Sequence, residues 1–125
     1  MGKEKSPLVG RGLGVIGVLL NYGMARLVPG TGVRRLVSAI GSPDEDTSVA
    51  AYMALVKLGP RNAKRLLKEA KKGQQTASLL QVLGDLHEPS VIPDLEEFAR
   101  SPDRKIADAA RESLEVLRSD EADGP

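Results

Sequence analysis

The chain has 125 residues, of which 41% are hydrophobic, and this suits one domain with a buried core rather than several domains. With two tyrosines and one phenylalanine, the core must be aliphatic and rich in alanine, which favours closely packed helices over strands. The absence of cysteine excludes disulfides and thiolate metal sites, and the single histidine, His87, offers little for a metal site or a catalytic set. We therefore expect a protein that is not an enzyme and needs no cofactor.

The net charge of +1 hides an uneven distribution of charge along the chain. Residues 1–72 contain 13 Lys and Arg against 5 Asp and Glu, whereas residues 73–125 contain 5 against 12. Both halves can form ordinary solvated helix surfaces. An asymmetry of this size also steers a molecule toward a charged partner.

The first predicted element is the apolar, glycine-rich segment of residues 1–30, in which residues 12–17 have the G-x-G-x-x-G spacing of a dinucleotide-binding turn. Such a turn needs a strand before it, a helix after it and an acidic residue about 20 positions later. No acidic residue lies between Glu4 and Asp44. The sequence therefore argues against a nucleotide site.

Two alternatives remain open for this segment. In the first, residues 8–28 form a membrane anchor, although the uncharged residues 12–25 rise only about 21 Å against a bilayer core of roughly 30 Å. A signal peptide cleaved after GMA and a myristoylated MGKEKS belong to the same class. In the second, which we favour, the segment is a half-repeat helix packed on the repeats that follow. Its outer surface would then be apolar and need cover from another subunit, a partner or lipid.

An internal repeat determines the expected fold of residues 31–118. The sequence SPDEDTSVAAYMALVKL, from Ser42, aligns with SPDRKIADAARESLEVL, from Ser101, at a constant offset of 59 residues that places Leu55 over Leu114. The segments VRRLV, AKRLL and PDLEEF divide this interval into units of about thirty residues. Each unit is predicted to be a short helix, a turn and a longer helix.

The turns within the units are predicted at GSPDED, KKGQQT and RSPDRK. Ser42 and Ser101 are predicted N-caps with Pro at the first helical position, and Glu45 falls where a capping-box glutamate belongs. Gly84 is among the residues predicted to mark the end of a unit. Residues 119–125, SDEADGP, are predicted to form an acidic disordered tail.

The helix expected from RNAKRLLKEAKK, residues 61–72, has a basic outer surface. Its cations lie opposite an apolar stripe with the i, i+3, i+4, i+7 spacing, and two arginines take the same places one unit earlier. We call this set the basic ridge: Arg34, Arg35, Arg61, Lys64, Arg65, Lys68, Lys71 and Lys72. It can be a solvated surface, a dock for a protein or anionic lipid, or a contact to nucleic-acid phosphates. The lack of aromatic residues leaves no stacking platform for single strands.

The segments LGPRNAKRLLKEAKKG and LGDLHEPSVIPDLEEFARSPDRKIADAARESLEVL resemble HEAT repeats of the short bacterial type related to phycobilisome-lyase repeats. The likeness covers residues 31–118 and depends on Leu-Gly before a Pro-containing turn, the Pro93-x-Leu95 helix start, the Ser-Pro-Asp link and the Ala-Ala-x-x-x-Leu helix. It implies an all-α fold, a short right-handed α-solenoid of about three and a half helix pairs that binds macromolecules. It does not identify the partner, because fold does not determine function.

We therefore expect a non-catalytic interaction or scaffold module that binds another protein through the basic ridge. One alternative is sequence-independent nucleic-acid binding through residues 61–72. Another is a membrane-anchored adaptor held by residues 8–28, a segment that could also join copies into a homo-oligomer. The expected location is the cytoplasm, at the membrane face if this segment associates with lipid.

Overall fold

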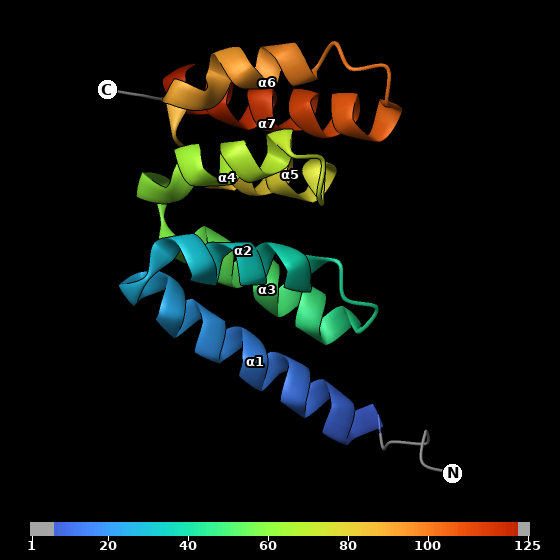
Figure 1. Cartoon of the computed structure of the whole chain (residues 1–125). Coiled ribbons are helices and arrows are strands. Elements are labelled where there is room, and N and C mark those ends of the chain that lie inside the picture. The colour runs from blue at the N-terminus through green and yellow to red at the C-terminus, as the bar shows by residue number, and fades with distance from the viewer. Residues whose placement is uncertain (1–6, 123–125) are drawn as a thin grey trace.

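The computed structural model describes residues 7–122, and every regular element in that range is a helix (Figure 1). The α-helices are α1 (Pro7–Leu27), α2 (Pro29–Ile40), α3 (Glu45–Leu58), α4 (Ala63–Lys71), α5 (Thr76–Asp85), α6 (Ile92–Phe98) and α7 (Arg104–Ala122). The short 3-10 turns η1 (Pro60–Asn62) and η2 (Pro89–Val91) precede α4 and α6. The prediction of an all-α fold is confirmed for these residues.

The helices form three pairs that are stacked in chain order, with α1 at one end of the stack (Figure 1). α2 packs against α3, α4 against α5, and α6 against α7, while α1 packs against both α2 and α3. The N-terminal segment thus contributes a helix that packs on the first pair. Because α2 begins at Pro29, the predicted boundary between residues 30 and 31 falls inside this helix.

The two Ser-Pro-Asp turns share one geometry, but their caps differ from the prediction. The hydroxyls of Ser42 and Ser101 accept hydrogen bonds, each at 3.1 Å, from the backbone N–H of Asp44 and Asp103. Each aspartate in turn accepts from the backbone N–H three residues later, at 3.2 and 3.3 Å. The aspartates are therefore the N-caps, and the serines tighten the turn before them. The predicted serine caps are wrong, and Glu45 is the first residue of α3.

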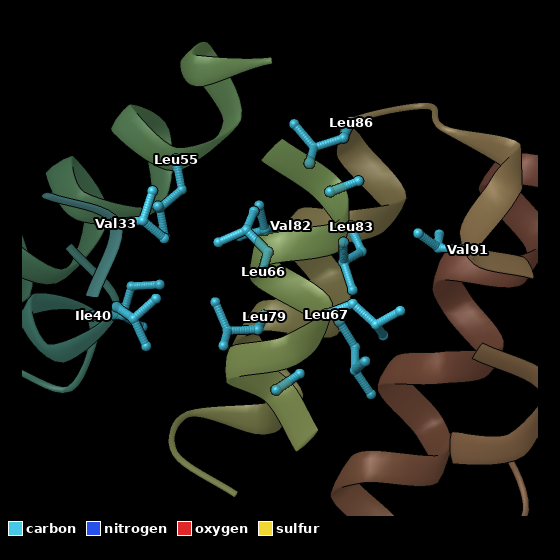
Figure 2. Packing of buried hydrophobic residues seen from close by; sticks show 14 of the residues in the cluster. Val33, Ile40, Leu55, Leu66, Leu67, Leu79, Val82, Leu83, Leu86 and Val91 are labelled. Carbon is cyan, nitrogen blue, oxygen red and sulfur yellow. The ribbon is translucent and has the colours of Figure 1, made fainter. Parts of the chain in front are cut away.

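The middle pair, α4 and α5, carries apolar residues on two sides. Figure 2 shows Leu66 and Leu79 directed toward the preceding pair, where Val33 lies, and Leu83 on the opposite side, toward Val91. All five side chains are buried. The four apolar positions predicted for α4 are likewise all buried. This pair therefore joins the N-terminal and C-terminal parts of the core.

Two glycines allow neighbouring helices to approach closely. A Cβ on Gly84 would lie 3.0 Å from the Cα of Ser113, whose hydroxyl donates to the carbonyl of Leu80 at 2.5 Å. A Cβ on Gly32 would overlap the backbone of Ala25, where α2 meets α1. Gly84 lies in the last turn of α5, close to the end of its unit as predicted, and it also allows the close α5–α7 contact.

The last helix continues past its predicted end. α7 extends through Ala122, so residues 119–122, predicted as part of a disordered tail, are helical. His87 follows α5 in the left-handed region, with φ of 55°, and its imidazole pairs with the carboxylate of Asp120. This contact ties the final turns of α7 to the end of α5. Residues 123–125 lie outside the described part.

Candidate interaction surface

All eight side chains of the basic ridge are exposed, and α4 carries four of them opposite its buried stripe. α2 and α4 lie in contact, and the ridge residues of the two helices come together beside Gly30. The Nε of Arg34 donates to the carbonyl of Gly30 at 3.3 Å, and the guanidinium of Arg65 lies 3.6 Å from where a Cβ on Gly30 would be. The ridge is therefore one continuous basic surface over two helices.

Part of the ridge is neutralised from within the chain. The Nζ of Lys71 lies 3.0 Å from a carboxylate oxygen of Asp94 on α6, and the Nζ of Lys72 lies 3.1 Å from Glu69. The Glu69 side chain is buried, with 7% exposure. The ridge residues that form no ion pair with a described residue are Arg34, Arg35, Arg61, Lys64, Arg65 and Lys68.

The start of α4 borders a cavity of about 660 Å³, where the last turns of α1 and α3 meet η1 and α4. We call it the cationic cavity, and its lining is Tyr22, Ala25, Arg26, Lys57, Leu58, Arg61, Asn62, Lys64 and Arg65. Five of these residues are cationic and none is acidic. Arg26 and Lys57 are absent from the predicted ridge. Cations in the last turn of a helix also favour its dipole, so the sequence does not distinguish them from ordinary helix ends.

The cations at the start of α4 do not stabilise their own helix. Lys64 and Arg65 lie in its first turn, near the positive end of the helix dipole, and that turn has no acidic residue. Lys64 and Lys68 are like charges at i and i+4, an arrangement that costs about 0.2–0.5 kcal/mol. Nearby, the pKa of Glu88 is lowered mainly by its hydrogen bonds to Ser90 and to a smaller extent by Lys64. Helix stability therefore does not account for these cations.

A second hollow, of about 470 Å³, lies over α2 and contains the other two ridge arginines. It is lined by Asn21, Thr31, Arg34, Arg35, Ser38 and Gln74, all of which are polar. Arg34 and Arg35 therefore belong to the same basic side of the molecule as the cationic cavity but do not line that cavity.

An apolar groove of about 610 Å³ follows the seam between α1 and α3 and shares Tyr22 and Lys57 with the cationic cavity. Its other lining residues are Val18, Leu19, Ala50, Tyr52, Met53, Ala54, Val56 and Asp85. The side chains of Leu19 and Met53 are 63% and 64% exposed. The sequence predicts an apolar outer surface on the N-terminal helix, but it gives no sign that Met53 faces solvent beside it.

One wall of the groove carries a polar pair. The hydroxyl of Tyr52 donates to the carboxylate of Asp85 at 2.5 Å, linking α3 to the last residue of α5. Burial raises the pKa of Tyr52 well above its usual range, and the hydrogen bond and charge of Asp85 raise it further. The phenol is therefore a permanent donor at neutral pH.

Comparison with protein-family models, curated proteins and solved structures found no match for this chain. The likeness to HEAT repeats stays a prediction from the residues, and the structure establishes an all-α stack of helix pairs in residues 7–122. No helix in the described part of the chain has both the length and the apolarity that crossing a bilayer requires. The segment MGKEKS lies outside the described residues.

Proposed function

We propose that this chain is a non-catalytic interaction module that binds an acidic partner protein through the basic ridge and the cationic cavity. The observation that carries the proposal is the lining of the cavity, in which five cations meet no carboxylate. Arg61 and Arg65 form no ion pair with a described residue. Acidic side chains of a partner would supply the missing counter-charges, and arginine pairs with carboxylates in a bidentate geometry.

A HEAT-like architecture accompanies this proposal. The shared geometry of the turns at Ser42 and Ser101 supports repeated helix pairs, and the packing of α1 on the first pair supports an additional half unit. We propose a short right-handed solenoid of about three and a half units. Stacked units of this kind present long continuous surfaces, which suits a module whose role is to bind macromolecules.

A second candidate function is sequence-independent nucleic-acid binding through residues 61–72. The observation in its favour is the exposed row of cations along α4, which extends past the cavity to Lys68. Contacts to phosphates alone would give the same affinity for unrelated sequences, and the logarithm of that affinity would fall linearly with the logarithm of salt concentration. The two candidates therefore differ in ligand and in salt dependence.

The test compares two variants with the same change in net charge. In the first, Arg61, Lys64 and Arg65 are each replaced by Glu. In the control, the exposed Arg100, Arg104 and Lys105 are each replaced by Glu. Fluorescence anisotropy measures binding of poly-glutamate and of two unrelated DNA duplexes over a range of salt concentrations.

We expect the wild-type chain to bind poly-glutamate, the first variant to lose more than about tenfold in affinity, and the control to lose much less. Equal losses of poly-glutamate affinity in both variants would show that binding depends only on the net charge of the protein, and would contradict the proposal. Tight duplex binding without poly-glutamate binding would favour the second candidate.

Stability provides an independent readout for the same surface. Because Arg65 lies in the first turn of α4, Arg65→Glu should raise the free energy of unfolding by about 0.3–1 kcal/mol while it weakens poly-glutamate binding. Urea denaturation measures the first quantity. A destabilised Arg65→Glu variant would show that the arginine serves the fold and not a partner.

A further inference from the structure

We infer that the partner presents an acidic amphipathic helix that lies along the α1–α3 seam, with its apolar side in the groove and its carboxylates over the cationic cavity. The inference rests on the proposed function and adds the chemistry of the partner segment. Two features carry it together: an apolar groove that is open to solvent and a cationic cavity that continues from the same seam.

The lining of the seam changes character along its length. On α1, Val18 and Tyr22 line the groove, and Arg26, one turn after Tyr22, lines the cavity. On α3, Met53 lines the groove and Lys57, one turn later, borders both. α1 and α3 run in the same direction (Figure 1). Both walls therefore change from apolar to cationic in the same direction.

This spacing matches the period of a helix. Val18 and Arg26 are eight residues apart, which corresponds to a rise of about 12 Å or two helical turns. A helix laid along the seam would place an apolar residue over the groove and, one or two turns later, carboxylates over the cavity. Amphipathic helices bind grooves in this way, through anchors at i, i+3, i+4 and i+7.

The groove distinguishes this partner from other anions. A nucleic-acid backbone or a free phosphate would pair with Arg61 and Arg65 but would leave Leu19 and Met53 in water. Asp85 on the groove wall would also repel any anion placed there. An amphipathic helix instead buries the exposed leucine and methionine side chains, and apolar burial is the main favourable term in most protein association.

The probes are two synthetic helical peptides of about 18 residues with equal negative charge. One has leucines along one side and glutamates clustered near one end, and the other has serine in place of each leucine. The groove variant combines Leu19→Ser with Met53→Ser. The control variant combines Leu20→Ser with Leu27→Ser, which alters exposed leucines of α1 that do not line the groove.

We expect the groove variant to lose about tenfold in affinity for the leucine peptide and to bind the serine peptide as the wild type does. The control variant should bind both peptides as the wild type does. Because all four altered side chains are exposed, circular dichroism should show an unchanged fold.

Three results would overturn the inference, and each has a different consequence for the proposed function. Equal affinities of the wild type for the two peptides would reject the groove but leave the basic surface as the binding site. Equal losses of affinity for the leucine peptide in the groove and control variants would show that the peptide does not bind along the seam. Binding of neither peptide, with duplex DNA still bound, would reject both the inference and the acidic-protein partner.

Discussion

The pairs α2–α3 and α6–α7 share one structural plan but differ at their surfaces. Both begin their second helix after the same Ser-Pro-Asp turn, and both bury the leucine that the repeat places in the same position. At the exposed positions of the second helix, however, α3 has Val49 and Met53 where α7 has Asp108 and Glu112. The plan of the pair therefore does not require apolar residues at these positions.

Several charged side chains of the C-terminal pair form ion pairs within the chain. Arg111 lies 3.2 Å from Asp108 on α7, and Arg118 of α7 lies 2.7 Å from Glu96 of α6. The cationic cavity beside α3 has no such partners in the described chain. The two pairs thus share their caps and buried leucines and differ in the exposed side chains, which are the ones that the proposed partner would contact.

The largest expected effect comes from the buried leucines that the two pairs share. Leu55→Ala and Leu114→Ala should each lower the free energy of unfolding by about 2–5 kcal/mol, because each removes a buried side chain and leaves a cavity. Urea denaturation measures the loss, with the exposed Glu112→Ala as the control. Similar losses for Leu114→Ala and Glu112→Ala would contradict the equivalence of the two pairs.

The shared caps should give the next largest effect. Asp44→Ala and Asp103→Ala should each cost about 0.5–2 kcal/mol, because each leaves backbone N–H groups in the first turn of a helix without an acceptor. Ser42→Ala and Ser101→Ala should cost less, since each removes only the bond that tightens the turn. Thermal unfolding measures the loss of stability in each variant. A greater loss in the serine variants than in the aspartate variants would show that the serines are the caps.

The first pair has a tyrosine, Tyr52, where the last pair has Arg111, and this tyrosine should make the stability of the protein depend on alkaline pH. Tyr52→Phe should cost about 0.5–1.5 kcal/mol at neutral pH, because it removes the hydrogen bond to Asp85. The folded-state pKa of Tyr52 is raised, so its stabilisation is complete below the unfolded value of about 10 and is lost as the pH rises above it. The variant should therefore lose less stability than the wild type above pH 10.

Denaturation at several alkaline pH values measures this difference. Tyr22→Phe is the matched control, because the Tyr22 hydroxyl forms no hydrogen bond with a described residue. An alkaline loss of the same size in the wild type and in Tyr52→Phe would show that Tyr52 does not cause it.

The smallest effect on stability should come from giving the exposed side of α3 the residues that α7 has at the same positions. A variant with Val49→Asp and Met53→Glu gives α3 the residues that α7 has at these positions, and it should change the free energy of unfolding by no more than about 0.5 kcal/mol. It should nevertheless bind the leucine peptide more weakly, because Met53 lines the groove. A large loss of stability would show that Val49 and Met53 stabilise the fold.

The sequence predicts the helix pairs well because the burial pattern is local. The stripe of α4 follows from helical period, and the alignment of Leu55 with Leu114 follows from the internal repeat; both agree with the structure. The caps were less predictable, since a Ser-Pro-Asp segment offers two acceptors two residues apart, and only the path of the chain decides which of them meets the free N–H groups.

The site was predictable only in part. The ridge on α4 is visible from the sequence because its cations share one helix. Arg26 and Lys57 join them only when α1 and α3 bring their ends together, and the burial of Glu69 depends on where the core lies. The groove depends on the seam between two helices, and no single stretch of sequence describes it.

The close contact at Gly84 has a consequence for local opening of the molecule. α5 and α7 meet at a glycine, with a buried hydrogen bond between Ser113 and Leu80, whereas α3 and α5 are linked at an exposed edge by Tyr52 and Asp85. Regions with few buried contacts open first and exchange their amide hydrogens faster. The stack should separate between α3 and α5, so that α1, α2 and α3 move as one body. A ligand held in the seam would then slow hydrogen exchange in that body and leave α7 unchanged.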